Sequence, residues 1–344
     1  MLRVDRSAIS GWSTGDESGI VGPMATPDDL DLRAPLRIGT RGSELALWQA
    51  HHVRDRLRER WGEALPIELV IITTEGDRIQ DRPLYQIGGK GLFVNAIEEA
   101  MLAGSIDLAV HSMKDLPGHL ADGLCLACTP PREDPRDALI VREDWTETRT
   151  LTSLPAGARV GTTSLRRAAL VRRLHGGAEI LPLRGNVPTR LQRLAEGKFD
   201  AIILAAAGLR RLDRLPEGAE LLDPELFCPA AGQGILALEC REDDARTRAL
   251  LAPLGDHDAA IAAATERTFL ARLEGGCQVP MGCHAVLEGD EVVVQGIVAD
   301  PSGAPFFRAT RRAPATTTKE AAALGRELAE LLLDLGAGAV LGRA

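Results

Sequence analysis

Residues 106–117 (IDLAVHSMKDLP) change from apolar to reactive side chains within one short stretch. The apolar run 106–110 is typical of a buried strand in a parallel sheet, and Pro117 prevents the strand from continuing. In open α/β sheets, ligands bind beyond the carboxyl ends of the strands. Asp115 is therefore a carboxylate at the place where such folds bind ligands and catalyse reactions. Near positive charges it should stay ionised, which suits it to stabilise a cation that forms during a reaction. The alternative is that Lys114 and Asp115 are ordinary solvated loop charges.

Positive charge is concentrated in residues 159–193, which hold eight arginines and one acid, Glu179. A structural arginine usually has an acidic partner, and this segment offers almost none, so we expect an anionic ligand. Guanidinium groups bind carboxylates and phosphates through paired hydrogen bonds. A phosphate-binding G-x-x-x-x-G-K-[ST] loop is absent, and the segment has no aromatic residue on which bases could stack. The pattern favours a small ligand with several anionic groups.

Cys277 lies between Gly275-Gly276 and Gln278-Val279-Pro280, an exposed setting for a residue type that prefers burial. A thiolate there could act as a nucleophile or as an anchor, and a buried structural thiol in a tight loop is an equally good alternative. A cysteine hydrolase would need a paired histidine, and nothing in the sequence pairs His111 or His284 with Cys277. The C-x-x-C at 125–128 has no second pair at zinc-ribbon spacing, so we expect buried free thiols and no metal site.

Two similar segments must position these side chains. Residues 37–41 (RIGTR) and 159–163 (RVGTT) each predict a strand, a Gly-Thr turn and a helix start, with Ser43 as a helix N-cap in the first. The second continues as a βαβαβ pattern to residue 205, which implies a parallel sheet. We expect two lobes that face each other and present helix N-termini, which bind anions, to a shared cleft. Limited turn chemistry is the alternative reason for the likeness.

The pattern changes after residue 257. Residues 291–299 and 306–312 predict two strands joined by a turn, and residues 318–335 predict an amphipathic helix. The predicted fold class is α/β, with two lobes whose sheets are mostly parallel and a small α+β C-terminal domain. The predicted organisation is a disordered N-terminal extension (1–33), a first lobe (34–131 and 231–253), a second lobe (135–228) and the third domain (257–344).

The overall composition narrows the class of protein. Of the 344 residues, 45% are hydrophobic and 26% charged, as in an ordinary globular protein, and the formal net charge is −9. This charge disfavours nucleic-acid and membrane partners. The sequence shows no run long enough to span a bilayer, and residues 1–33 lack the layout of a secretory signal. We therefore expect a cytoplasmic protein, with a monomer as the default.

Several motifs together resemble the hydroxymethylbilane synthase family, also called porphobilinogen deaminases. The resemblance runs in order from about Leu36 to the C-terminus, and the first 33 residues lie outside it. The main motifs are HSMKDLP (111–117), GTTSLRR (161–167), LRGNV (183–187) and LEGGCQVP (273–280). Further matches are GKGLF (89–93), REDPRDA (132–138) and AAAGL (205–209).

The resemblance implies two lobes of the periplasmic-binding-protein type (type II) and a small domain that carries the cysteine. It implies a transferase of tetrapyrrole (haem, chlorophyll and corrin) biosynthesis that joins four porphobilinogen molecules head to tail and releases ammonia at each step. Its cofactor would be one dipyrromethane per chain, made from substrate and bound by a thioether to Cys277. Asp115 would be the catalytic carboxylate, which stabilises the cationic azafulvene left when ammonia departs.

The resemblance also implies two sets of binding residues. Because porphobilinogen carries an acetate and a propionate, the growing chain is a polyanion, which accounts for the arginines. Lys90 and Phe93 match a mobile loop that covers the cleft. The implied cofactor-binding residues are Cys277, Lys114, Thr162, Thr163, Ser164, Arg166, Arg167, Arg184, Gly185, Arg190 and Ala205. The implied substrate-binding residues are Arg41, Ser43, Gln49, Lys90, Phe93, Arg211 and Gln233.

Two other function classes stay open on the sequence. Two-lobed folds of this kind often only capture small anions, but such proteins are usually exported and no export signal is visible. A nucleic-acid binder would need aromatic platforms or a general basic surface, and aromatic residues are only 3% of the chain. Cys277 and Asp115 together favour the enzyme.

Overall fold

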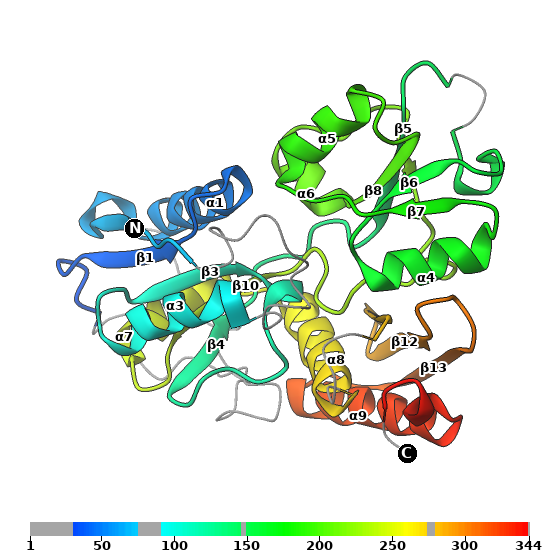
Figure 1. The fold of residues 1–344 in the computed structure, drawn as a ribbon. Coiled ribbons are helices and arrows are strands. Elements are labelled where there is room, and N and C mark those ends of the chain that lie inside the picture. Colours follow the sequence, from blue (N-terminus) through cyan, green and yellow to red (C-terminus); the bar gives the residue numbers. More distant parts are fainter. Residues whose placement is uncertain (1–29, 75–90, 146–148, 274–278, 343–344) are drawn as a thin grey trace.

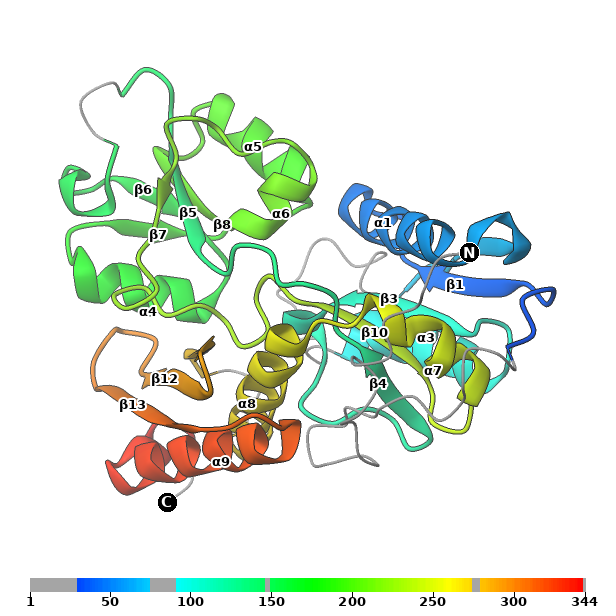
Figure 2. The ribbon, with the colours of Figure 1, turned by 180° about the vertical axis from the view of Figure 1, so that it is seen from behind.

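The computed structural model describes residues 30–74, 91–145, 149–273 and 279–342. Two five-stranded sheets and one three-stranded sheet, each packed with helices, form three units (Figure 1). Views from both sides show two lobes, with the third unit packed below the second lobe and its first helix beside the first (Figure 2). Within the described ranges, no helix is long and apolar enough to cross a membrane.

The first lobe is built on a sheet of strand order β2-β1-β3-β10-β4. Strand β1 pairs in parallel with β2 and β3, whereas β10 runs antiparallel to β3 and β4. The strands are β1 (Leu36–Thr40), β2 (Ile67–Ile71), β3 (Leu108–Ser112), β4 (Leu124–Cys128) and β10 (Leu236–Arg241). The helices are α1 (Glu44–Trp61), α3 (Gly91–Leu102) and α7 (Ala245–Leu251), with short 3₁₀ turns η3 (Gly62–Ala64), η5 (Met113–Asp115) and η7 (Ala252–Leu254).

The second lobe repeats this topology in the order β7-β6-β8-β5-β9. Strand β6 is parallel to β7 and β8, and β5 is antiparallel to β8 and β9. The strands are β5 (Asp137–Val141), β6 (Arg159–Gly161), β7 (Glu179–Leu181), β8 (Ala201–Ala205) and β9 (Glu220–Leu221). The helices are α4 (Leu165–Leu174), α5 (Val187–Ala195) and α6 (Ala206–Arg211), with the 3₁₀ turn η6 (Leu151–Ser153).

The α/β fold class is confirmed, and each sheet is more mixed than the βαβαβ pattern alone suggests. The predicted parallel pairings are present around β1 and β6. Strands β5 and β10 are antiparallel because each enters its sheet directly after the chain has crossed from the other lobe. These two crossings, at about residues 129–136 and 229–235, were not visible as a repeating pattern.

The third unit is an antiparallel sheet covered by two long helices. A capping box between Thr317 and Glu320 begins the second helix, and a Cβ added at Gly325 would lie 2.1 Å from the Thr265 carbonyl oxygen, so this glycine allows the two helices to approach closely. The elements are α8 (His257–Leu273), β11 (Met281–Glu288), β12 (Glu291–Ala299), β13 (Phe306–Pro314), α9 (Thr318–Asp334) and the turn η8 (Ala337–Ala339). We propose the predicted domain boundaries as the division between these units; most of the predicted extension 1–33 lies outside the described residues.

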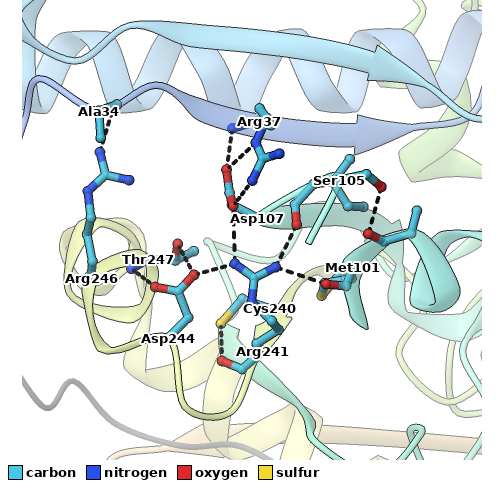
Figure 3. A network of polar contacts seen from close by, with 12 residues as sticks. Ala34, Arg37, Met101, Ser105, Asp107, Cys240, Arg241, Asp244, Arg246 and Thr247 are labelled. Carbon is cyan, nitrogen blue, oxygen red and sulfur yellow. Dashed lines mark hydrogen bonds and ion pairs between the residues drawn. The ribbon is translucent and has the colours of Figure 1, made fainter. Parts of the chain in front are cut away.

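An arginine–aspartate clamp fixes the amino end of the first lobe's central strand (Figure 3). The backbone N–H and Nε of Arg37 both donate to Asp107 Oδ2 at 3.0 Å, and Nη2 donates to Oδ1 at 2.7 Å. Arg241, at the end of β10, adds a bond from Nη2 to the same Oδ1 at 3.1 Å. Asp107 precedes β3 and Asp115 follows it, so the clamp holds the end of the strand opposite to the predicted site.

The second lobe has the same clamp at the equivalent place. Arg159 donates from its backbone N–H (2.9 Å) and Nε (3.0 Å) to Asp200 Oδ2 and from Nη2 to Oδ1 (2.8 Å), while Arg142 Nη1 reaches Oδ1 at 3.3 Å. The glycines of the repeated motif are also equivalent, since a Cβ at Gly39 would lie 2.4 Å from Ile106 and one at Gly161 2.7 Å from Phe199. The likeness of the two sequence segments therefore reflects repeated packing and not turn chemistry alone.

Replacing Asp200 by asparagine should lower the free energy of unfolding at pH 7 by about 2 kcal/mol. Hydrogen bonds from Arg159 lower the pKa of the Asp200 carboxyl to about 2 in the folded protein. A depressed folded-state pKa gives stability that is present above the unfolded value near 4 and lost as the pH falls toward 2. Urea unfolding should show that the difference in unfolding free energy between the parent protein and Asp200→Asn is smaller at pH 3 than at pH 7. Asp243→Asn, on the exposed surface, is the neutral control. A difference independent of pH would exclude this charge effect.

Candidate functional site

Asp115 lies in the 3₁₀ turn η5, directly after the central strand β3 of the first lobe. Its side chain is exposed, while the neighbouring Met113 and Leu116 are 2% and 1% exposed. The Met113 N–H donates to the Ile235 carbonyl oxygen at 3.0 Å, so the second crossing holds the start of the turn. The buried neighbours fix the backbone that presents the exposed carboxylate.

A small cavity of about 80 Å³ adjoins Asp115. The Gln49 amide Nε2 donates to Ser112 Oγ at 2.8 Å, which joins α1 to the end of β3. Ser43 is the N-cap of α1, as predicted, because its Oγ accepts from the Ala46 N–H at 3.3 Å. Among the implied site residues, those lining this cavity are Arg41, Ser43, Gln49 and Asp115. The structure thus brings a helix N-terminus, an arginine and the carboxylate to one place.

A chain of polar contacts leads from Lys114 across to the second lobe. Lys114 Nζ lies 3.5 Å from Gln233 Oε1, and Gln233 Nε2 donates to Asp137 Oδ1 at 3.1 Å and to the Pro135 carbonyl oxygen at 2.7 Å. Burial, opposed by Asp115 and aided by Arg167 and Arg166, lowers the pKa of Lys114 to about 8. Gln233 is 1% exposed and its amide bridges the lobes, so its polar atoms are engaged within the chain.

Arg166 and Arg167 share one buried acidic partner, which corrects the expectation that the arginine segment has almost none. Arg166 Nη2 lies 2.8 Å from Asp137 Oδ2, and Arg167 donates to Oδ1 from Nε (3.0 Å) and Nη2 (2.7 Å). Burial alone would raise the pKa of Asp137, but the two arginines lower it to about 2. The partner stands on β5, outside the 159–193 segment, so a local count of charges could not find it.

Positive charge still exceeds negative charge around Asp115. Arg190 donates from Nε to the Gly185 carbonyl oxygen at 2.7 Å. Burial lowers the pKa of Arg190 to about 10, with Arg167 acting in the same direction and Asp115 opposing it. In the part of the chain that the structure describes, the Arg184 guanidinium makes no hydrogen bond or ion pair. Cations from the second lobe therefore form one electrostatic cluster with Asp115 of the first.

The implied hydroxyl residues shape the N-terminus of α4. Ser164 Oγ caps the helix by accepting from the Arg167 N–H at 3.4 Å, and Thr162 Oγ1 accepts from the Ser164 N–H at 3.1 Å. Thr163 Oγ1 donates to the Leu183 carbonyl oxygen at 3.2 Å. Ala205 pairs with Asp137 in the sheet and precedes α6. These residues hold the turn that presents Arg166 and Arg167.

Three implied residues lie in segments that are wholly or partly outside the described residues. Cys277 and Lys90 lie outside the described residues, as does the side chain of Phe93, whose backbone is in α3. The chain on each side of the Cys277 segment is described, however. Leu273 and Val279 belong to the same apolar cluster as Met113 and Leu116, the neighbours of Asp115.

Helix α8 also holds the segment after Asp115. Arg267 Nη1 and Nη2 donate to the carbonyl oxygens of Pro117 (3.1 Å) and Gly118 (2.9 Å). Because α8 ends at Leu273, the same helix contacts the Asp115 loop and leads into the Cys277 segment.

Glu266 is a central residue that the sequence reasoning missed. It is fully buried, and its Oε1 accepts from Arg132 Nη1 (2.7 Å) and the Ala285 N–H (2.8 Å), while Oε2 accepts from the Gly232 N–H (2.6 Å). One carboxylate on α8 thereby joins both interlobe crossings to the third unit. The available signal was an acid directly after the alanine-rich first half of α8.

A buried network of His111, Glu239 and Glu98 lies behind the cavity. His111 Nε2 lies 2.8 Å from Glu239 Oε2, and the two side chains are 7% and 0% exposed. Burial and the neighbouring Glu239 raise the pKa of Glu98, which favours its protonated form beside that carboxylate. His111 also lines the Asp115 cavity, so this network supports the cavity wall from behind. Glu98, which is followed by Glu99, and Glu239 were not singled out in the sequence.

The comparisons with known proteins agree on one family. A model of the "Porphobilinogen deaminase, dipyromethane cofactor binding domain" matches residues 36–249, and a model of the "Porphobilinogen deaminase, C-terminal domain" matches residues 260–334. Porphobilinogen deaminase of Syntrophotalea carbinolica is 51% identical over 306 residues, which cover 89% of this chain and 95% of the relative. That of Roseiflexus castenholzii is 51% identical over 310 residues, with coverage of 90% and 99%.

Solved structures similar to this chain include the VFT2 domain of BvgS from Bordetella pertussis, with 13% identity, a TM-score of 0.40 and coverage of 67% of this chain and 92% of that domain. Another is the probable amino-acid ABC transporter extracellular-binding protein ytmK from Bacillus subtilis, with 11% identity, a TM-score of 0.39 and coverage of 64% and 90%. The family models and the curated relatives confirm the resemblance inferred from the motifs, and the chain belongs to the porphobilinogen deaminase family.

Proposed function

We propose that this chain joins four porphobilinogen molecules head to tail into a linear tetrapyrrole, with release of ammonia at each step. The observation that carries the proposal is the position of the Asp115 carboxylate within a cluster of cations drawn from both lobes. A polyanionic substrate needs the cations, and a cationic intermediate needs the carboxylate. Membership of the family supplies the substrate and the reaction.

The cationic cluster fits the dipyrromethane cofactor that the family implies. Its two pyrrole rings carry an acetate and a propionate each, and Lys114, Arg184 and Arg190 are cations without a tightly bound carboxylate among the described residues. We propose that these three side chains bind its carboxylates, with Arg166 and Arg167 contributing the excess charge not balanced by Asp137. When bound, the dipyrromethane supplies the free pyrrole carbon to which new units are joined.

Cys277 is the proposed point of attachment. The other five cysteines of the chain are buried free thiols, and for Cys125 and Cys128 this agrees with the prediction from the sequence. Burial raises the pKa of Cys228 to about 12 and raises the pKa values of Cys128 and Cys283 as well, so these thiols are poor nucleophiles. The described residues on either side of the Cys277 segment, Leu273 and Val279, belong to the apolar cluster that also contains Met113.

Asp115 is the proposed catalytic carboxylate. Loss of ammonia from porphobilinogen leaves a cationic azafulvene, and a fixed carboxylate nearby lowers the energy of the transition state that leads to it. Its oxygens can also accept hydrogen bonds from pyrrole N–H groups and so orient the ring. We propose that Arg41, Ser43 and Gln49, which line the adjoining cavity, bind the incoming substrate. The monomeric state and the cytoplasmic location stay predictions from the sequence.

Product stoichiometry tests this function against simple anion capture. We expect incubation with porphobilinogen to release four molecules of ammonia for each linear tetrapyrrole, measured after acid quenching. A binding module would instead remove about one porphobilinogen per chain and release no ammonia. That second result would contradict the proposal.

A further inference from the structure

A second and larger cavity lies between the lobes. It has a volume of about 300 Å³ and shares no lining residue with the cavity at Asp115. Its walls come from α1 of the first lobe, the first crossing at residues 130–133, β10, and Arg211 at the end of α6 of the second lobe. Both ribbon views show α1 and α6 facing each other at this place (Figures 1 and 2). We call it the hinge pocket and define it by Trp48, His52, Arg56 and Arg211.

Arg211 is a buried cation without a carboxylate partner. It is 9% exposed, and its Nη2 donates to the Gly234 carbonyl oxygen at 2.8 Å. Among the described residues, Arg211 forms no ion pair with a carboxylate. Burial lowers the pKa of Arg211 to about 10, and Glu133 opposes the shift only in part. A buried charge is costly unless it is paired, so an anion in the pocket would stabilise this arginine.

The remaining charges of the pocket also favour an anion. Burial, Arg211 and Arg56 lower the pKa of His52, while Asp55 and Glu59 oppose the shift. The exposed Arg56 Nη1 lies 3.6 Å from Glu59 Oε2, a surface pair that is easily exchanged for another anion. Arg132 is already paired with the buried Glu266 at 2.7 Å and adds little to this field. Glu133, the one acid among the described residues that line the pocket, accepts through Oε1 from the Asp134 N–H at 2.8 Å.

The pocket also offers flat apolar walls. The Trp48 and His52 rings are stacked, with centroids 5.0 Å apart and planes 7° from parallel. The Arg211 guanidinium lies 6.0 Å from the Trp48 ring centroid. The remaining apolar lining comes from Val53, Pro130, Pro131, Leu236 and Leu254. The volume is at the lower end of small-molecule sites, which suits a single ring.

We propose that the hinge pocket binds a monocyclic aromatic carboxylate, with the carboxylate on Arg211 and Arg56 and the ring against the Trp48–His52 stack. Such a ligand would contact both lobes and hold them in one relative position. On the proposed function, porphobilinogen itself belongs to this chemical class, and the pocket is then a second substrate subsite outside the Asp115 cavity. The binding claim itself does not depend on that function.

The His52 imidazole reports occupancy without any turnover. Pyrrole-2-carboxylate is a suitable probe, and pyrrole-2-carboxamide is its uncharged control. A carboxylate beside His52 should raise its pKa by about half a unit or more, because an anion favours the imidazolium form. We expect a saturable shift in the NMR titration of His52, assigned from the spectrum of His52→Gln, and no shift with the carboxamide. An unchanged His52 titration at high probe concentration would overturn the proposal.

Matched variants separate this pocket from the catalytic cavity. Three variants should each weaken binding of the probe, followed by the His52 shift, at least about tenfold: Arg211→Met, Arg56→Gln and Trp48→Leu. Each of them removes one charged or stacking contact. Arg41→Ala, which alters the Asp115 cavity, should leave the response intact. Loss of the response in Arg41→Ala, or its persistence in both Arg56→Gln and Trp48→Leu, would overturn the proposal even if Arg211→Met fails to fold.

The source of the ligand is settled by competition in the Asp115→Asn variant, in which turnover should be minimal. Displacement of pyrrole-2-carboxylate by porphobilinogen, followed at His52, would assign the pocket to the substrate. Probe binding without displacement would support the pocket and contradict its assignment as a substrate subsite.

Discussion

The Asp115→Asn variant should lose about a hundredfold or more in kcat while keeping its fold, since removal of one well-placed electrostatic stabiliser has an effect of this size. The side chain is exposed, and the buried Met113 and Leu116 hold the turn on both sides. Asparagine has almost the same shape, so the change removes charge and little else. The substitution should therefore change kcat much more than KM, because the cation exists only during the reaction.

Two controls make this prediction specific. Asp122→Asn removes another exposed carboxylate of the first lobe and should retain near-parent turnover. The pKa of Lys114 provides a readout that does not need activity: Asp115 raises it at present, so it should fall in Asp115→Asn. Near-normal tetrapyrrole formation by the variant would remove Asp115 from the role proposed here.

Replacing Glu266 by glutamine should lower the free energy of unfolding by about 3 kcal/mol or more. The change leaves the Arg132 guanidinium, on a side chain only 13% exposed, without its carboxylate and weakens the bonds to the N–H groups of Gly232 and Ala285. Because these contacts join both crossings to the third unit, the lobes and the Cys277-bearing unit should unfold less cooperatively. Urea unfolding followed by circular dichroism measures both effects.

The surface pair on the same unit is the matched control. Glu330 contacts Arg272 and is 46% exposed, so Glu330→Gln should cost less than about 1 kcal/mol. Replacing both Glu266 and Arg132 by apolar residues should recover part of the loss, since no buried charge is then left unpaired. Equal losses for Glu266→Gln and Glu330→Gln would contradict the central role of Glu266.

Local features of the sequence were sufficient for much of the secondary structure. The strand, turn and helix start predicted at 159–163 agree with β6 and the start of α4, and the βαβαβ pattern predicted to residue 205 ends with β8. The predicted strand 291–299 agrees with β12. Caps explain this success, because Ser164 and Asn186 satisfy free N–H groups at the starts of α4 and α5. The position of Asp115 at a strand end followed from an apolar run that stops at a polar turn.

Contacts between segments far apart in the chain could not be predicted from the sequence. Asp137 meets Arg166 and Arg167 only because β5 enters the second lobe beside β8. Glu266 meets Arg132, 134 positions earlier, through the packing of α8 on the first crossing. No local periodicity encodes such pairs, and the same holds for the hinge pocket, whose walls come from both lobes.

The central claim is that the protein builds its product on a dipyrromethane bound to Cys277. Intact-protein mass spectrometry after acid denaturation tests it directly, on protein made in a cell that supplies porphobilinogen. The mass should exceed that of the polypeptide by two porphobilinogen molecules less two ammonia molecules, and Cys277→Ser should show the bare polypeptide. A bare mass for the parent protein, or the same added mass on Cys277→Ser, would contradict the account.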